Sequence, residues 1–197
     1  MTAISTRLLP DTAGVGDDGE LSIGGCRVSD LASQYGTPLF VYDEAHLRAR
    51  CREAVRSFGV GRAVYASKAF LCKAMAKLAY DEGMMLDVAS GGELHVALAA
   101  GVPASALALH GNNKSTDELA AGLKAGVGRI IVDSLDEIER IEQLCQANGW
   151  HARVMVRVTP GVEAHTHQYI ATAHEDQKFG FSITNNQAMV AMVRCHY

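Results

Sequence analysis

The chain lacks several features that would assign it to a specialised class of protein. It has no Cys-x-x-Cys pair, and its five cysteines are scattered, so neither a disulfide framework nor a thiolate zinc site is predicted. Its N-terminus lacks the basic and then apolar order of a signal peptide, and no apolar run approaches the ~18 residues of a membrane span. We therefore expect a cytoplasmic protein with no membrane partner.

An excess of positive charge is also absent. The net charge is −4, which provides no basic surface for nucleic acid or for an anionic membrane. The hydrophobic share of 48% and the charged share of 20% are ordinary for a globular protein. The composition therefore predicts a folded protein without a nucleic-acid partner.

A regular series of short apolar runs, each ending in a polar side chain, is the main pattern that is present. The polar residues lie 19 to 24 residues apart, which is the length of a strand plus a crossover helix. This spacing predicts an α/β fold, a parallel barrel whose reactive groups lie at the C-terminal ends of the strands. The five polar residues are Lys68, Asp87, His110, Asp133 and Arg157.

The same pattern predicts the elements of the barrel. Glycines at 83, 101, 126 and 149 follow apolar-periodic stretches, as expected where helices end. Strands are predicted over 62–67, 84–88, 106–110, 129–133 and 152–158, and helices over 70–82, 91–100, 115–125, 135–148 and from Gln187 onward.

Only five barrel strands are recognised in the 197 residues, whereas an eight-stranded barrel takes about 250 residues. We therefore expect a partial barrel with an open edge, occupying residues 43–197 and starting with a helix capped by Asp43. Residues 1–20 are polar and rich in glycine, which predicts a flexible leader. Residues 21–42 contain short extended stretches around a helical piece.

Lys68, at the end of the first predicted strand, could act as a nucleophile if desolvation and nearby cations lowered its pKa. The alternative is a surface lysine at a turn. Asp87 would lie across the barrel mouth from Lys68, or it could merely begin a helix favourably. The following Ser90-Gly91-Gly92 turn could offer backbone N–H groups to a phosphate, although glycine pairs are common at helix starts.

The next three strand ends differ in what they predict. His110 begins a run of donors, His-Gly-Asn-Asn-Lys, of which ordinary turn chemistry explains the asparagines better than the histidine. Asp133 is interpreted as part of a helix start. Arg157 lies in an apolar strand, where a guanidinium needs a carboxylate, a phosphate or a ring as a partner. The alternative for Arg157 is a buried ion pair with a neighbouring strand.

The long polar segment after Thr159 contains His165 and His167 and invites a metal interpretation. Nothing in this segment predicts the helical or strand framework that would aim the two histidines at one ion. We therefore expect no metal site.

Five ordered motifs together resemble the diaminopimelate decarboxylase family, whose members are fold-type III pyridoxal-phosphate enzymes. The resemblance extends from about residue 20 to about residue 183 and covers the first part of the family's protein. The motifs are Val64-Tyr-Ala-Ser-Lys-Ala-Phe-Leu-Cys72, Leu86-Asp-Val-Ala-Ser-Gly-Gly-Glu-Leu94, His110-Gly-Asn-Asn-Lys-Ser115, Arg157-Val-Thr-Pro-Gly-Val-Glu-Ala-His-Thr-His167 and Asp176-Gln-Lys-Phe-Gly-Phe181.

The resemblance implies a barrel like that of alanine racemase, with residues 21–42 as the N-terminal segment of a β domain. It implies decarboxylation of meso-diaminopimelate to lysine by a homodimer, and it places Lys178 near the subunit interface. Lys68 would form a Schiff base with pyridoxal 5'-phosphate. The implied cofactor-binding residues are Lys68, Asp87, Glu93, His110 and Arg157.

The family's later elements have no match in this chain, including its glycine-rich phosphate loop and its catalytic cysteine, for which Cys195 is no substitute. We therefore expect an N-terminal fragment that binds cofactor poorly and turns over little. Other interpretations are a non-catalytic pyridoxal-phosphate-binding barrel, an ornithine or arginine decarboxylase, and a metal-dependent hydrolase using His110, His165 and His167.

Overall fold

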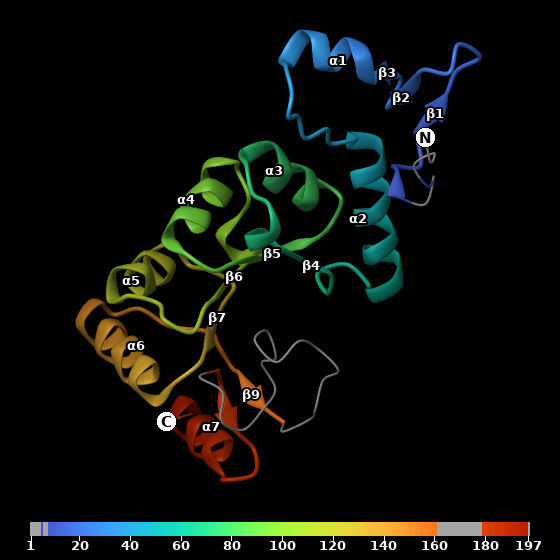
Figure 1. Ribbon diagram of the computed structural model, residues 1–197. Coiled ribbons are helices and arrows are strands. Elements are labelled where there is room, and N and C mark those ends of the chain that lie inside the picture. Colours follow the sequence, from blue (N-terminus) through green and yellow to red (C-terminus); the bar gives the residue numbers. More distant parts are fainter. Residues whose placement is uncertain (1–4, 6–7, 161–178, 197) are drawn as a thin grey trace. The chain divides into compact units, whose positions relative to one another are not determined.

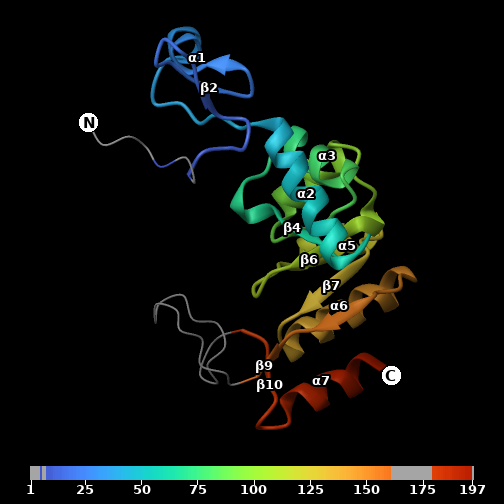
Figure 2. The same ribbon diagram turned by 90° about the vertical axis from the view of Figure 1, so that its right-hand side faces the viewer.

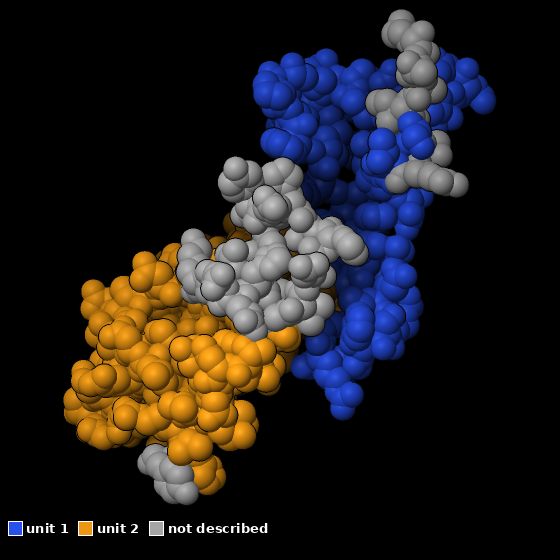
Figure 3. Space-filling model, turned by 60° about the horizontal axis from the view of Figure 1, so that its bottom comes forward, with its two compact units in different colours: residues 1–63 blue, residues 64–197 orange. Residues whose placement is uncertain are grey.

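The computed structural model describes residue 5, residues 8–160 and residues 179–196 of the chain. The chain forms two compact units, Met1–Ala63 and Val64–Tyr197, which Figure 3 distinguishes by colour. No helix in these described ranges combines the length and the apolar character that crossing a membrane requires.

The first unit contains a small antiparallel sheet followed by two helices. Strand β2 (Leu21–Ile23) pairs with β1 (Gly14–Val15) on one side and with β3 (Cys26–Arg27) on the other. Strand β1 lies within the region for which the sequence predicted a flexible leader. It is structured because it pairs with β2, and because Ser22 Oγ donates to the Gly14 carbonyl oxygen at 3.2 Å.

Helices α1 (Val28–Tyr35) and α2 (Glu44–Phe58) complete this unit. Asp43 caps α2 as predicted, since its Oδ1 accepts from His46 N at 3.0 Å. The predicted domain boundary at residue 42 stays a prediction, while the compact units divide at residue 63 and α2 is grouped with the N-terminal segment. The physical reason is that α2 contacts the N-terminal segment: His46 Nδ1 accepts from Asp11 N at 3.0 Å, and Arg50 lies 3.3 Å from the Asp11 carboxylate.

The second unit is built on a five-stranded parallel sheet in the order β4-β5-β6-β7-β8, which confirms the predicted βα series. Helices α3, α4, α5 and α6 follow one another along one side of this sheet (Figure 1). The strands are β4 (Val64–Ala66), β5 (Met85–Val88), β6 (Leu107–His110), β7 (Arg129–Val132) and β8 (Val154–Val156). The helices are α3 (Lys73–Asp81), α4 (Gly91–Ala99), α5 (Thr116–Ala125) and α6 (Leu135–Asn148).

A further parallel strand extends the barrel pattern beyond the five predicted strands. β9 (Val158–Thr159) continues from β8, and β10 (Phe181–Ser182) pairs with it in parallel, with Phe181 opposite Val158. Helix α7 (Gln187–His196) then lies beside β10 in both ribbon views (Figures 1 and 2). The sequence predicted this helix but not β10 as a barrel strand, because a run of two residues carries no detectable period.

One face of the sheet is buried under the helices, and it carries the core. Gly122 of α5 shows how close the layers are, because a Cβ there would lie 2.9 Å from Leu109 Cδ2. Each fully buried aliphatic side chain contributes roughly 1.5–3 kcal/mol. The buried strand residues are Leu86, Val88, Leu107, Leu109, Ile130 and Val132.

The opposite face of the sheet is only partly covered by the described residues. Strand side chains alternate between faces, so this face carries Asp87, His110 and, on β8, Met155. Met155, on β8 at the end of the five-stranded sheet, is 46% exposed. Such exposure of the inner face agrees with the predicted partial barrel.

Serine side chains begin three of the helices that cross between strands. Ser90, Ser115 and Ser134 each accept a hydrogen bond at 3.2 Å from the backbone N–H three residues later. Gly126 and Gly149 end α5 and α6 in the left-handed conformation that the predicted helix stops require. These caps fix where each strand end turns into a helix, and the candidate site lies along those turns.

Candidate active site

The five polar residues predicted at strand ends all lie at the C-terminal edge of the sheet. Because the strands are parallel and adjacent, their ends meet along one edge. Lys68 lies in the 3-10 turn Ser67–Ala69 after β4, Asp87 lies in β5, and His110 ends β6. Asp133 and Arg157 follow β7 and β8 directly. The arrangement of these groups could therefore be predicted from their spacing.

Lys68 is exposed among the described residues. The sequence left open whether Lys68 is a desolvated nucleophile or a surface lysine at a turn, and its role as a nucleophile stays a prediction. The turn that carries Lys68 is held by Tyr65, whose hydroxyl donates to the Phe70 carbonyl oxygen at 2.5 Å. The neighbouring Ser67 Oγ is buried and has no hydrogen-bond partner within the described ranges. An accessible amine on a braced turn is thus presented at the sheet edge.

Asp87 and His110 form a side-chain pair on adjacent strands. His110 Nδ1 lies 2.9 Å from Asp87 Oδ2, and the two side chains are 31% and 25% exposed. The sequence suggested that Asp87 lies across the barrel mouth from Lys68, but the structure places it on the neighbouring strand. β4 and β5 pair directly, with Ala66 opposite Asp87, so the lysine turn and the Asp87–His110 pair are neighbours along the edge. The pairing fixes the orientation of the imidazole ring beside the lysine turn.

Arg157 meets a carboxylate and a ring. Its Nη1 lies 3.3 Å from Asp133 Oδ1, and its guanidinium lies 4.5 Å from the centre of the Phe179 ring. Two of the three kinds of partner that the sequence named for Arg157 are therefore present, and the ion pair joins the ends of neighbouring strands as the alternative proposed. Asp133 precedes the helix cap Ser134 as predicted, but it also holds Arg157.

The Ser90-Gly91-Gly92 turn is not an open phosphate cradle. Glu118 Oε1 accepts from Gly91 N at 2.7 Å, and Glu93 Oε2 accepts from Ala89 N at 2.6 Å. One N–H group of the turn, that of Gly91, is therefore bonded to a carboxylate, and a second carboxylate takes the N–H of the preceding residue, Ala89. Glu93, predicted to bind cofactor, here braces the backbone between β5 and α4.

Replacing Glu118 with glutamine should lower stability at neutral pH and leave it unchanged in acid. Hydrogen bonds from Ser115 N and Gly91 N hold the pKa of Glu118 below its usual range. The ionised carboxylate therefore stabilises the fold above its ordinary pKa of 4.5, and this stabilisation is lost as the pH falls through the lowered folded-state value. We expect a loss of about 1 kcal/mol at pH 7 in urea unfolding, typical of a lost helix-capping interaction.

Asp117, an exposed neighbour in the same helical turn, provides the matched control. Asp117→Asn should change stability far less than Glu118→Gln at neutral pH. A difference between wild type and Glu118→Gln that stayed constant from pH 7 to pH 3 would contradict the assignment.

The structure reveals a buried ion pair that the sequence did not predict. Lys114 Nζ lies 2.8 Å from Glu137 Oε1, and both side chains are 1% exposed. Burial raises the pKa of Glu137 despite the opposing attraction of Lys114. The sequence signal was weak: Ser134-x-x-Glu137 matches a helix-start pattern, and nothing distinguished Lys114 from a surface lysine.

Several predicted groups fall outside the described residues. These are His165, His167 and Lys178, so the metal interpretation and the interface residue are not located here. Within residues 8–160 and 179–196, no group of three or more His, Cys, Asp and Glu side chains is placed to hold a metal ion.

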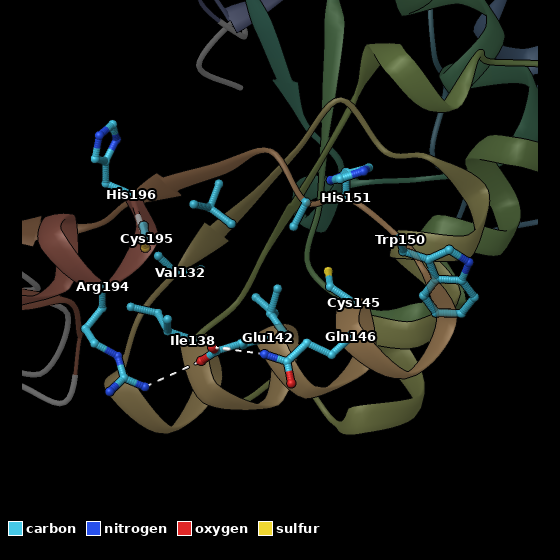
Figure 4. Close-up of a pocket in the computed structure, with 13 residues that line it drawn as sticks. Val132, Ile138, Glu142, Cys145, Gln146, Trp150, His151, Arg194, Cys195 and His196 are labelled. Carbon is cyan, nitrogen blue, oxygen red and sulfur yellow. Dashed lines mark hydrogen bonds and ion pairs between the residues drawn. The ribbon is translucent and has the colours of Figure 1, made fainter.

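A pocket of about 330 Å³ lies between α6 and α7, on the side of the sheet away from Asp87 and His110 (Figure 4). Two residues that line the pocket form an ion pair, with Arg194 Nη2 3.5 Å from Glu142 Oε2. Burial raises the pKa of both of its thiols, Cys145 and Cys195. None of the predicted site residues lines this pocket, so it is separate from the strand-end site.

The donor set at the sheet edge fits pyridoxal phosphate at its aldehyde end. A primary amine is the group that reacts with an aldehyde, and Lys68 presents one to which no carboxylate of the described residues is bound. The carboxylate-held imidazole of His110 and the cation of Arg157 lie on the following strand ends. The Ser90 turn does not fully account for the phosphate end, because the Gly91 N–H is bonded to Glu118.

Comparison with known proteins gives one matching family model and a consistent group of relatives. The model described as "Pyridoxal-dependent decarboxylase, pyridoxal binding domain" matches residues 44–196. Diaminopimelate decarboxylase of Mycobacterium tuberculosis (strain H37Rv) is 54% identical over 177 residues, which is 89% of this chain and 40% of that protein. The Bacillus subtilis enzyme is 50% identical over 173 residues, or 86% of this chain and 39% of that protein.

Solved structures agree with these relatives. Diaminopimelate decarboxylase of M. jannaschii in complex with L-lysine superposes with a TM-score of 0.82 at 31% identity, over 95% of this chain and 45% of that one. The chain thus spans about 40% of the length of the curated relatives that it matches.

Proposed function

Since the chain belongs to the family of pyridoxal-dependent decarboxylases, we propose that it supplies the lysine-bearing part of an enzyme that converts meso-diaminopimelate to L-lysine. The observation that carries this proposal is the row formed by Lys68 and the Asp87–His110 pair on adjacent strand ends of a parallel sheet. The L-lysine bound to the M. jannaschii relative supports a product of this chemical class.

Each residue of the row has a distinct role in the proposed enzyme. Lys68 holds the cofactor through Nζ, and Tyr65 keeps the lysine turn in place. Asp87 binds Nδ1 of His110, which leaves Nε2 as the ring nitrogen available to a ligand. When bound, pyridoxal phosphate supplies the electron sink that accepts the electron pair left by departing carbon dioxide.

Arg157 and Asp133 place a fixed positive charge at the next strand end. The Phe179 ring covers the guanidinium, so the cation has few conformations and loses little entropy when it meets an anionic group. Its proposed role is to attract and orient a negatively charged part of the cofactor or substrate.

The domain and assembly assignments are also part of the proposal. Residues 43–197 form the barrel segment, which the family match over residues 44–196 supports, and residues 21–42 belong to a β domain. The five free cysteines support a reducing compartment, the cytoplasm. By resemblance we propose a homodimer, which light scattering on the purified protein tests directly.

The function is tested by following carbon dioxide release and L-lysine formation from meso-diaminopimelate with added pyridoxal phosphate. The 197-residue chain is assayed alone and fused to the remaining part of the B. subtilis relative. We expect the chain alone to release little, and the fusion to act on meso-diaminopimelate in preference to L-ornithine and L-arginine.

The complete B. subtilis enzyme serves as the positive control, and the fusion carrying Lys68→Ala serves as the matched negative control. A folded fusion that prefers L-ornithine or L-arginine would overturn the substrate. A folded fusion inactive on all three amino acids would overturn the function.

A further inference from the structure

The Lys114–Glu137 pair is a buried charged group for which the proposed chemistry has no direct use. Both side chains are 1% exposed, so neither can touch a substrate at the open sheet edge. Burying two charges costs several kcal/mol per ion before their attraction repays it, and an apolar pair of similar volume often serves stability as well. Stability alone therefore does not explain the presence of this pair.

The ammonium of Lys114 also contacts the backbone next to His110. Lys114 Nζ donates to the Ile131 carbonyl oxygen at 2.8 Å and to the Gly111 carbonyl oxygen. Gly111 follows His110 in the chain, and Ile131 is the β7 residue paired with His110. An ammonium has three N–H donors, and two of them are used by these backbone carbonyls, while Glu137 Oε1 balances the charge from 2.8 Å. Lys114 thus holds the backbone on both sides of His110.

A second contact restrains the loop from its other end. Arg140 of α6 donates through Nη1 to the Lys114 carbonyl oxygen at 2.7 Å. Both Glu137 and Arg140 lie on α6, so this helix contacts both the side chain and the backbone carbonyl of Lys114. The strand-end loop after β6 is therefore held by α6, the third element that follows it in the chain.

We propose that Lys114 and Glu137 are positioning residues that fix the backbone around His110 and thereby hold its imidazole against Asp87. The consequence for cofactor binding rests on the proposed function, whereas the positioning of His110 does not. An active-site group held by its neighbours in this way loses about 10- to 100-fold in ligand affinity when they are removed, by analogy with groups that orient metal ligands.

The test uses the whole chain and the variant Lys114→Met/Glu137→Leu, which replaces the ion pair by an apolar pair. Lys124→Met, an exposed lysine on α5, is the matched control. Three quantities are measured: the midpoint of thermal unfolding, the imidazole ¹⁵N shifts of His110 without cofactor, and the dissociation constant of pyridoxal phosphate. We expect the double variant to unfold near the wild-type midpoint, with altered His110 shifts and cofactor binding roughly 10-fold weaker or more.

Glu137→Gln is the conservative variant, because it keeps the shape of the side chain and an oxygen beside Lys114 Nζ. It should keep the wild-type His110 shifts even if its unfolding midpoint falls, and altered shifts in this variant would overturn the proposal. Wild-type shifts in a folded double variant would also overturn it, and if the double variant does not fold, Glu137→Gln decides. If the unmodified chain binds no measurable cofactor, the His110 shifts alone decide the positioning role, and the proposed function is decided separately by the activity of the fusion.

Discussion

Replacing Lys68 with alanine should abolish covalent attachment of pyridoxal phosphate to the chain. Lys68 is an exposed amine on a braced turn, one strand away from the Asp87–His110 pair. When the wild-type chain is incubated with excess pyridoxal phosphate and reduced with borohydride, mass spectrometry should locate one pyridoxyl group on Lys68. In a complete enzyme the same substitution should lower the turnover number by several orders of magnitude, because the nucleophilic amine is lost.

Lys73 is the matched control, since it is exposed at the start of α3, five residues further along the chain. Lys73→Ala should be labelled as well as the wild type. Equal labelling of Lys68 and Lys73, or full labelling of Lys68→Ala at other lysines, would mean that labelling depends on the exposure of a lysine and not on a specific cofactor site.

Replacing Gly128 with alanine should destabilise the second unit by about 3 kcal/mol or more, at the upper end of overpacking. A Cβ on Gly128 would lie 2.2 Å from the Ser105 carbonyl oxygen and 3.2 Å from the Leu107 carbonyl oxygen. Both are backbone atoms, so no side chain can rotate to make room. The start of β7 would have to move away from β6. Leu107 of β6 and Ile130 of β7 are fully buried at this place, so the shift would disturb the core. Urea unfolding followed by far-UV circular dichroism measures the loss.

Gly92 gives the opposite expectation from the same substitution. It lies in the first turn of α4, and a Cβ there would meet only Ser90 Oγ at ordinary contact distance, 3.8 Å. Gly92→Ala should be neutral or stabilise the chain by up to about 1 kcal/mol, because glycine is a poor helix former. Equal destabilisation by the two substitutions would show that the close approach at Gly128 is not the cause.

The barrel part of the fold could be predicted because its signal is local and repeated. Each run of apolar residues ended in a polar group, and each crossover helix had its own glycine stop, so Lys68 and Arg157 could both be assigned to one edge before any contact was known. The short strands escaped prediction for the converse reason. β1 and β10 have two residues each, and only pairing with β2 and β9 makes them strands.

The contacts of the site could be predicted only in part. The need of Arg157 for a carboxylate or a ring followed from the cost of a charge in an apolar strand, and both Asp133 and Phe179 meet that need. The pairing of His110 with Asp87 depends on strand register, which local patterns do not encode. Lys114 was indistinguishable from an exposed lysine, since its burial depends on Glu137 of a later helix.

The order of the sheet also determines how the chain can assemble as it is made. Because β4, β5, β6, β7 and β8 are neighbours in the same order as in the sequence, every strand after β4 leaves the ribosome when its partner already exists. Each pairing closes only one short crossover, and loop-closure entropy rises slowly with loop length. The groups at the strand ends are thus brought to the sheet edge one after another during translation, with Lys68 first and Arg157 last.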